Sequence, residues 1–365
     1  MKVILTGGGT GGHIYPAIAI ADQIKAQHPD AEILFVGTQK GMEKDLVPQA
    51  GYPIRFITAS GLDRKNLLKN VKTVRDVLKG MAEAKAILQD FKPDAVIGTG
   101  GYVCGPIVKQ AQAMKIRTFL HEQNAFPGVT NKLLAKGAEK VFISFQEAAN
   151  HFKGVQHMVA VGNPIRKDFF TGSKEEYREK LGIPQDAFVV LCFGGSRGAY
   201  AINTAMTAAV DSLKDVPGLK LCFVTGRYYY DSIAEELQRK DVAGAGGNVQ
   251  LFPYVNNMHE YLLASDLVIS RSGALTVSEI TACGKASVLI PSPNVTGNHQ
   301  FFNAKVVSDR GGAVLLEEKD LTPESLVQAI LSVKDSSEKK ASMEAAARTV
   351  GTADAAKRIV DSLQL

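Results

Sequence analysis

Short apolar runs alternate with predicted helices along most of the chain, and this pattern limits the possible folds more than any other feature. KVILT, AEILFVG, DAVIGTG and RTFLHE occur in the first half, and FVVLCFGG, LKLCFVTG and DLVISRS occur in the second. Runs that are apolar throughout are typical of strands buried on both faces, as in parallel sheets covered by helices. The sequence therefore predicts an α/β fold with parallel sheets.

The pattern is interrupted near residues 162–184, whose sequence GNPIRKDFFTGSKEEYREKLGIP is rich in glycine, proline and charge. A strand and a second glycine loop, LCFGGSRGAYAINTAM, then begin the same architecture again. We predict two doubly wound, Rossmann-like domains over residues 1–163 and 164–344. The Ala-rich segment at about 345–365 comes too late to start another sheet, and we expect it to form a helix that packs back on the first domain.

Composition sets the broad class. The chain has 365 residues, 45% of them apolar, which is enough for two domains with substantial cores. The net charge of +5 suits anionic small molecules or a lipid surface and does not argue for nucleic acid. The four scattered cysteines indicate reduced packing residues in a cytosolic protein. Neither an export signal nor an apolar run of about 18 residues is visible, so we expect a soluble protein that could bind a membrane surface.

The first glycine loop, GGGTGG at residues 7–12, follows the first predicted strand and is followed by His13. Glycine lets the backbone approach a ligand closely, and a helix N-terminus suits phosphate. The second strand, FVGTQKG, lacks the carboxylate that a nicotinamide site needs, and the lysine of a P-loop is missing after Gly12. His13 is either a capping and packing residue or a general base, because imidazole titrates near neutral pH.

A polar stretch in the second half, SRSGALTVSEI, places a turn at residues 270–273 before a predicted helix. Glu279 could compensate the helix dipole or accept hydrogen bonds from both hydroxyls of a ribose. Gln300 and Asn303 in GNHQFFNA could cap a helix or bind sugar hydroxyls. Asp-x-Asp, the usual metal-binding pair of nucleotide-sugar transferases, does not occur in the sequence. If this chain binds the diphosphate of a nucleotide-sugar donor, we therefore predict that binding requires no metal cofactor, and that amides, a helix end and cations meet the diphosphate charge.

Several motifs taken together resemble the MurG family of glycosyltransferases, in glycosyltransferase family 28. They are GGTGGHIYPAIAIA, GTGGYVCGP, HEQNAFPGVTNKLLA, VGNPIR, GGSRGAYAIN and SRSGALTVSEI followed by GNHQFFNA, and they span nearly the whole chain. The resemblance implies the GT-B fold, in which two Rossmann-like domains face each other across a cleft. It also implies an inverting enzyme of peptidoglycan synthesis. Such an enzyme moves N-acetylglucosamine from UDP-GlcNAc to the 4-hydroxyl of undecaprenyl-pyrophosphoryl-MurNAc-pentapeptide.

The resemblance also implies roles for individual residues, most of them in the second domain. Val255 would meet the uracil through its backbone, Glu279 the ribose and Ser196 the pyrophosphate, whereas Arg197 and Tyr200 receive no role. His13 is the first choice as base for the acceptor hydroxyl, and Glu122 is the second. The complete donor set is Thr10, Gly11, Gly12, Asn124, Arg166, Ser196, Val255, Ala274, Leu275, Thr276, Val277, Ser278, Glu279 and Gln300.

The segment LDRKNLLKNVKTVRDVLKGMAEAKAIL carries an apolar stripe and a basic stripe at helical spacing. Core packing with a solvated basic face would explain both stripes. Alternatively, this face docks on an anionic leaflet, because each basic residue near such a surface contributes about 1 kcal/mol. A lipid-linked acceptor favours docking at the cytoplasmic face of the membrane, through Lys65, Leu67, Leu68, Lys69 and Lys72.

Other functions remain open at this point. A UDP-N-acetylglucosamine 2-epimerase uses the same paired-domain plan but needs no lipid acceptor. A two-domain binding protein would close on an anionic ligand without chemistry, although its periplasmic versions need an export signal. A dehydrogenase is disfavoured by the missing ribose carboxylate.

Overall fold

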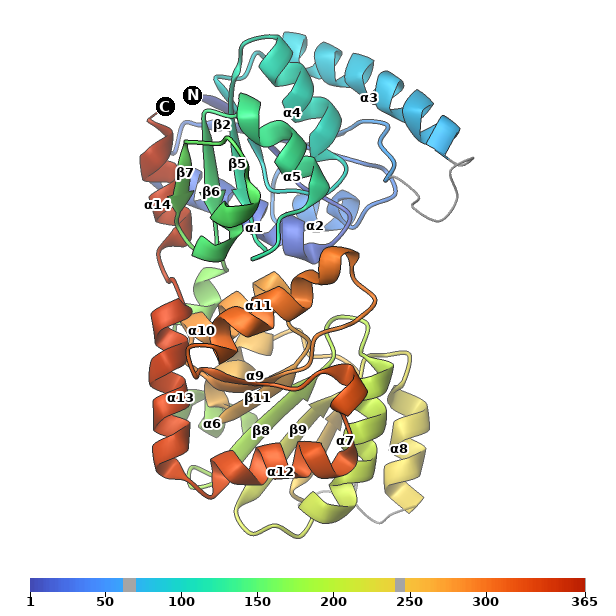
Figure 1. Cartoon of the computed structure of the whole chain (residues 1–365), viewed down its shortest axis with the longest axis vertical. Helices are drawn as coiled ribbons and strands as arrows, with labels where there is room; N and C mark the ends of the chain where they lie inside the picture. Colours follow the sequence, from blue (N-terminus) through green and yellow to red (C-terminus); the bar gives the residue numbers. More distant parts are fainter. Residues whose placement is uncertain (62–69, 240–246, 365) are drawn as a thin grey trace. The chain divides into compact units, whose positions relative to one another are not determined.

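The computed structural model describes residues 1–61, 70–239 and 247–364, and the chain divides into two compact units (Figure 1). Unit 1 comprises Met1–Arg166 and Ala353–Leu365, and unit 2 comprises Lys167–Thr352. Each unit has its own parallel β-sheet, so each is described by itself.

Unit 1 is built on a sheet with the strand order β3-β2-β1-β4-β5-β6-β7. The strands are β1 (Lys2–Thr6), β2 (Glu32–Gly37), β3 (Ile54–Phe56), β4 (Ala95–Gly98), β5 (Arg117–Glu122), β6 (Lys140–Ile143) and β7 (Met158–Ala160). β1 pairs in parallel with β2 on one side and with β4 on the other. The strand order therefore reverses between β1 and β4, where sheets of this kind bind their ligands.

Helices cover both faces of this sheet, because neighbouring strand residues point to opposite sides. Val3 and Leu5 of β1 pack in a core with α1 and α14, whereas Ile4 packs in a core with α3, α4 and α5. The helices of unit 1 are α1 (Gly11–Gln27), α2 (Glu43–Gln49), α3 (Asn70–Phe91), α4 (Cys104–Ala113), α5 (Val129–Leu134) and α14 (Ala355–Leu363), with 3₁₀ turns at Ala135–Gly137 and Gln146–His151.

Unit 2 repeats this plan with the strand order β10-β9-β8-β11-β12-β13. The strands are β8 (Phe188–Phe193), β9 (Leu219–Val224), β10 (Val249–Phe252), β11 (Leu267–Ser270), β12 (Ala286–Leu289) and β13 (Ala313–Leu315). β8 pairs in parallel with both β9 and β11, so the order reverses between β8 and β11. This reversal is the second place in the chain where the fold favours ligand binding.

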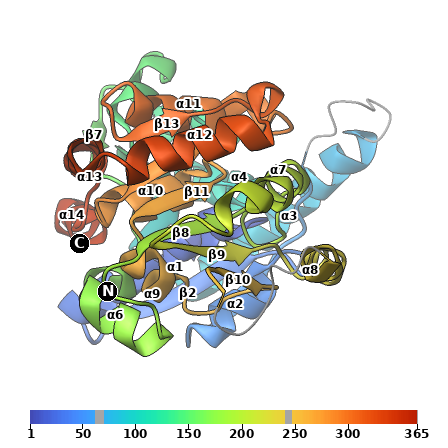
Figure 2. The ribbon, with the colours of Figure 1, turned by 90° about the horizontal axis from the view of Figure 1, so that it is seen from below.

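A large apolar core fills one face of this sheet. It is formed by strand residues with α7, α8, α12 and α13, and Figure 2 shows α12 and α7 passing over β8 and β11. The helices of unit 2 are α6 (Lys174–Leu181), α7 (Tyr200–Leu213), α8 (Tyr230–Arg239), α9 (Met258–Ala264), α10 (Ala274–Ala282), α11 (His299–Ser308), α12 (Pro323–Lys334) and α13 (Ser337–Val350), with 3₁₀ turns at Lys167–Phe170, Thr296–Asn298 and Glu318–Asp320.

The C-terminal segment is divided between the two units. α13 packs against α10 and β12 in unit 2, whereas α14 packs against α1 in unit 1 (Figure 1). Gly351 ends α13, and a Cβ there would lie 2.4 Å from the carbonyl oxygen of Thr281, so this position needs glycine. α13 therefore ends where the chain packs closely against the backbone at Thr281.

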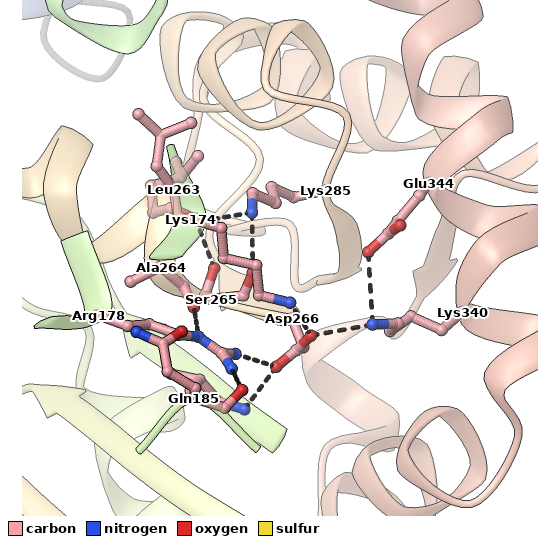
Figure 3. A network of polar contacts seen from close by, with 12 residues as sticks. Lys174, Arg178, Gln185, Leu263, Ala264, Ser265, Asp266, Lys285, Lys340 and Glu344 are labelled. Carbon is pink, nitrogen blue, oxygen red and sulfur yellow. Dashed lines mark hydrogen bonds and ion pairs between the residues drawn. The ribbon is translucent and has the colours of Figure 1, made fainter. Parts of the chain in front are cut away.

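A buried polar network joins α6, α13 and the sheet of unit 2 (Figure 3). Asp266, just before β11, accepts hydrogen bonds from Lys174 and Arg178 of α6 at 2.6 Å each and from Lys340 of α13 at 3.0 Å. The amide of Val189 in β8 donates to the same carboxylate at 2.8 Å. One aspartate thus meets three cations and fixes two helices to adjacent strands.

Candidate functional site

The two loops that follow β1 and β4 meet at the reversal point of unit 1. The side chain of Thr99 donates to the carbonyl oxygen of His13 at 2.7 Å. A Cβ at Gly7 would lie 2.0 Å from that threonine oxygen, so only glycine fits beneath it. Gly9 has a φ of +84°, a left-handed conformation that other residues rarely adopt. The glycines predicted from the sequence therefore serve a close contact and a turn.

His13 lies in the first turn of α1, beside this loop. Its Nδ1 is 3.2 Å from the carbonyl oxygen of Gly8 and 3.3 Å from the hydroxyl oxygen of Thr10. A carbonyl oxygen only accepts hydrogen bonds, so these distances fit a proton on Nδ1 and a lone pair on Nε2. Gly100 lies next to the ring, since a Cβ there would be 3.1 Å from Nε2. This tautomer is the one that can take a proton at Nε2.

Glu122 ends β5 and is 2% exposed. One of its oxygens accepts from the backbone and side-chain amides of Asn124, at 3.0 and 3.1 Å. The other accepts from the amide of Gly128 at 3.1 Å and from Asn131 at 2.8 Å. These four donors fix the carboxylate to the loop at 123–128 and to Asn131 of α5.

His121, beside Glu122, is buried and neutral. Burial lowers the pKa of the His121 imidazole to about 4. Its Nε2 faces the carbonyl oxygen of Gly162 at 2.9 Å, and its Nδ1 is 2.9 Å from the side-chain amide nitrogen of Gln123. The first contact assigns the proton to Nε2, so His121 orders the strand ends rather than moving protons.

The reversal point of unit 2 brings the second glycine loop and α10 together. Ser196 is exposed in the loop after β8, and α10 begins at Ala274 directly after β11 and its turn. The N-caps of α7 and α10 are Ala199 and Gly273, and neither makes a side-chain capping bond. The first amides of a helix have no partner within it. Both helix ends can therefore bind an anion.

The other predicted donor residues lie on nearby loops or in unit 1. Val255 is 7% exposed in the loop after β10. Gln300 is the second residue of α11, and its side-chain oxygen accepts from the amide of Ser292 at 2.8 Å. Arg166 is the last residue of the first segment of unit 1, where its guanidinium lies 5.7 Å from the ring of Tyr15.

A cavity of about 700 Å³ adjoins Ser196 in unit 2. Arg227 lies over the ring of Tyr254 at 5.2 Å on its wall. Sequence reasoning gave Arg197 no role, but the structure places it in this lining, because β8, β9 and β10 end at the same edge of the sheet. The lining residues are Ser196, Arg197, Arg227, Tyr228, Tyr229, Tyr254 and Asn256.

Most of the predicted membrane-docking residues, Lys65, Leu67, Leu68 and Lys69, lie outside the described residues. Lys72 falls within α3, but its side chain is not among those described. Farther along α3, Leu78 is 68% exposed, whereas Leu88 is buried in the core. On α5, Leu133 is 75% exposed. Unit 1 therefore presents large apolar side chains on α3 and α5.

Two further searches cover only the described part of the chain. No three acidic, histidine or cysteine side chains there are arranged to hold a metal ion. No helix there is both long enough and apolar enough to cross a bilayer.

Two family models match the chain. The glycosyltransferase family 28 N-terminal domain matches residues 3–143, and the family's C-terminal domain matches residues 189–359. The chain belongs to glycosyltransferase family 28. Family 28 enzymes are glycosyltransferases, so the prediction of a transferase is confirmed, and each family domain falls on one of the two sheets.

Curated relatives match this family 28 member over its full length. The UDP-N-acetylglucosamine–N-acetylmuramyl-(pentapeptide) pyrophosphoryl-undecaprenol N-acetylglucosamine transferase of Acetivibrio thermocellus is 44% identical over 364 residues, covering 100% of this chain and 98% of the relative. The protein of the same name from Bacillus licheniformis is also 44% identical, with the same coverage. These matches confirm the resemblance to the MurG family.

Solved structures support the fold. MurG from Acinetobacter baumannii has a TM-score of 0.78 and 28% identity, covering 100% of this chain and 99% of that one. A UDP-GlcNAc 2-epimerase from Neisseria meningitidis, bound to UDP-GlcNAc, has a TM-score of 0.70, 14% identity and the same coverage. At that identity the second likeness concerns the fold alone. The predicted fold class, two Rossmann-like domains of the GT-B type, is confirmed.

Proposed function

We propose that this glycosyltransferase moves N-acetylglucosamine from UDP-GlcNAc to the 4-hydroxyl of undecaprenyl-pyrophosphoryl-MurNAc-pentapeptide. The observation that carries this function is the full-length similarity, at 44% identity, to relatives named for that transfer. The product, a lipid-linked disaccharide pentapeptide, is an intermediate of peptidoglycan synthesis. Residues 1–163 take the lipid-linked acceptor, and residues 164–344 hold most of the donor.

The donor binds at the reversal point of unit 2. Ser196 and the first amides of α7 and α10 meet the diphosphate, and Glu279, one turn into α10, accepts hydrogen bonds from the ribose hydroxyls. The backbone of Val255 meets the uracil. We assign the lining of the nucleotide site to Ala274, Leu275, Thr276, Val277 and Ser278, and contacts with the sugar to Thr10, Gly11, Gly12, Asn124 and Gln300.

The transfer is a single displacement with inversion at the anomeric carbon. The acceptor oxygen forms the new bond as the bond to UDP breaks, and His13 Nε2 takes the proton of the acceptor hydroxyl. The Nδ1 contact of His13 with the Gly8 carbonyl oxygen supports this role. Negative charge grows on the leaving diphosphate, and helix amides and Arg166 stabilise it without a metal ion.

The enzyme acts peripherally at the cytoplasmic face of the membrane, where its lipid-linked acceptor is anchored. The exposed Leu78 and Leu133 support docking through unit 1, and basic residues of α3 and the segment before it add attraction to an anionic leaflet. Nucleic acid is not a partner.

One assay separates this function from epimerisation. The protein is incubated with labelled UDP-GlcNAc and a lipid-linked muramyl-pentapeptide acceptor, and label is then counted in the lipid phase. If the protein transfers N-acetylglucosamine, label should appear in the lipid phase only when the acceptor is present. Conversion of UDP-GlcNAc to its 2-epimer without acceptor would support the epimerase instead.

The His13→Ala variant tests the base in the same assay. Turnover should fall about 100- to 10,000-fold, which is the usual contribution of a general base. Near-normal turnover would remove His13 from this role and leave Glu122 as the remaining candidate.

A further inference from the structure

The peptide group between Gly8 and Gly9 is held at both ends by side chains of unit 1. Its carbonyl oxygen, that of Gly8, lies 3.2 Å from Nδ1 of His13. Its amide nitrogen, that of Gly9, donates to Oε2 of Glu43 at 3.1 Å. A carboxylate on α2 is thereby linked to the imidazole on α1 through one peptide group.

Glu43 is built into this position. It begins α2 and is 1% exposed. Its Oε1 accepts from the backbone amide of Thr38 at 2.9 Å and from the threonine hydroxyl at 2.7 Å. Gly8 and Gly41 provide the space for the carboxylate, because a Cβ at either would lie 2.7 Å or less from its atoms. Amide and hydroxyl donors therefore hold a buried carboxylate directly under the glycine loop.

The carbonyl of Gly8 is confined on another side as well. Gly101, in the loop after β4, has a φ of +84°, and a Cβ there would lie 2.4 Å from the Gly8 oxygen. The backbone of this loop thus packs against the oxygen that faces His13. The oxygen occupies the space that a side chain at residue 101 would need, so this close packing requires glycine there.

A buried negative charge at one end of a peptide group affects the other end. The carboxylate attracts the amide hydrogen of Gly9 and so increases the partial negative charge on the carbonyl oxygen of Gly8. That oxygen accepts a hydrogen bond from an imidazole N–H and repels an imidazole lone pair. When one ring nitrogen of a histidine donates to such an oxygen, the tautomer of the ring is fixed. The second ring nitrogen also becomes more basic.

We infer that Glu43 is a positioning residue for His13, which acts through the Gly8–Gly9 peptide to keep the imidazole proton on Nδ1 and the lone pair on Nε2. This inference rests on the proposed role of His13 as the base. Glu43 itself gains and loses no proton during transfer. The acceptor's proton moves to Nε2, and the same peptide oxygen then stabilises the charged imidazolium.

The test is nitrogen NMR of the full chain labelled with ¹⁵N-histidine, because its long-range couplings report which ring nitrogen carries the proton. The His13→Asn variant assigns the signal. In the unmodified protein at a pH where the ring is neutral, His13 should show its proton on Nδ1. A proton on Nε2 would overturn the inference without any Glu43 variant.

Glu43→Gln is the main variant. A glutamine can accept the Gly9 amide only by turning its own NH₂ toward the donors of Thr38, so one contact is lost and the charge is removed. We expect a mixture of His13 tautomers and a loss of about 10- to 100-fold in kcat. KM for both substrates should change by less than about threefold, because Glu43 contacts neither substrate.

Thr38→Val is the matched control. It removes one donor from the same carboxylate but leaves the Gly9 contact and the charge in place. Its melting temperature should fall, as in Glu43→Gln, whereas its His13 tautomer should remain that of the unmodified protein. An equal tautomer change in both variants would reduce Glu43 to a structural role and overturn the inference.

The two proposals can fail separately. Normal turnover in His13→Ala removes the base assignment, while the NMR comparison still decides whether Glu43 sets the tautomer. If His13→Ala loses turnover but folded Glu43→Gln keeps the His13 tautomer of the unmodified protein, His13 remains the proposed base. Only the role of Glu43 is then removed.

Discussion

Protonation of Asp266 should destabilise unit 2, because this carboxylate pairs with Lys174, Arg178 and Lys340 at once (Figure 3). Burial by itself would raise the pKa of the Asp266 carboxyl. Hydrogen bonds from Lys174, the amide of Val189 and Lys340 outweigh that effect and lower the pKa to about 2 from the ordinary value of 3.8. The folded state therefore releases this proton more readily than the unfolded chain does.

The pKa difference gives the size of the effect. A lowering of nearly two units, at about 1.4 kcal/mol per unit, corresponds to about 2.5 kcal/mol of stability. This contribution is complete above the unfolded pKa, near pH 4. It is lost as the pH falls through the folded pKa near 2, because the unfolded state binds its proton first.

Substitution at neutral pH should cost more than protonation. Asp266→Asn leaves the buried guanidinium of Arg178 beside Lys174 and Lys340 without the Asp266 carboxylate, and breaking a buried pair costs about 3–5 kcal/mol. Glu139→Gln is the control, because it removes the same charge from an exposed pair with Arg117. Exposed pairs contribute no more than about 1 kcal/mol.

The assay is urea denaturation followed by circular dichroism at several pH values between 2 and 7. Hydrogen exchange of peptides covering β8 and α6 assigns the transition to unit 2. The difference in unfolding free energy between the unmodified protein and Asp266→Asn should shrink by about 2 kcal/mol between pH 6 and pH 2, because about half of the folded molecules still carry the charge at a pH equal to the folded pKa. A difference that is the same at both pH values, or below about 1 kcal/mol at pH 7, would refute this reasoning.

Three further predictions concern the proposed site and the membrane. Glu279→Gln should weaken UDP binding about tenfold or more in calorimetry, because a hydrogen bond to a charged group contributes about 1.5–3 kcal/mol; unchanged affinity would remove Glu279 from the ribose site. Chelation with EDTA should leave UDP affinity unchanged, and a loss restored by magnesium would contradict metal-free binding. Charge reversal of Lys65, Lys69 and Lys72, or Leu78→Glu, should reduce cosedimentation with phosphatidylglycerol vesicles while turnover on a detergent-solubilised acceptor persists; unaffected binding would reject docking through this face.

The repeated architecture could be predicted because its signal is local. A strand buried on both faces is apolar at every position, and the runs at residues 2–6 and 188–193 show this without any tertiary information. The glycine loops could be placed for the same reason, since each directly follows such a run. The reversal points then follow from the strand order of a doubly wound sheet.

The contacts that organise the site could not be predicted in this way. Glu43 in GMEKDLVP reads as an acidic residue in a first helical turn, and nothing local indicates that it is buried under a loop 34 residues earlier. Asp266 and Lys174 are 92 residues apart. The four hydrogen bonds to Glu122 come from residues 124–131, and they appear only when this segment is folded over the end of β5.

The two glycine loops look equivalent in the sequence, but their surroundings differ in charge. In unit 1 the amide of Gly9 already donates to the buried carboxylate of Glu43, so this amide is not available to a phosphate. The carboxylate also places a negative charge beneath the loop. In unit 2 the loop at Ser196 adjoins a cavity that carries Arg197 and Arg227. A diphosphate is repelled by the first arrangement and attracted by the second. This difference supports binding of the diphosphate in unit 2, and it leaves the loop of unit 1 to contact the sugar and to orient His13.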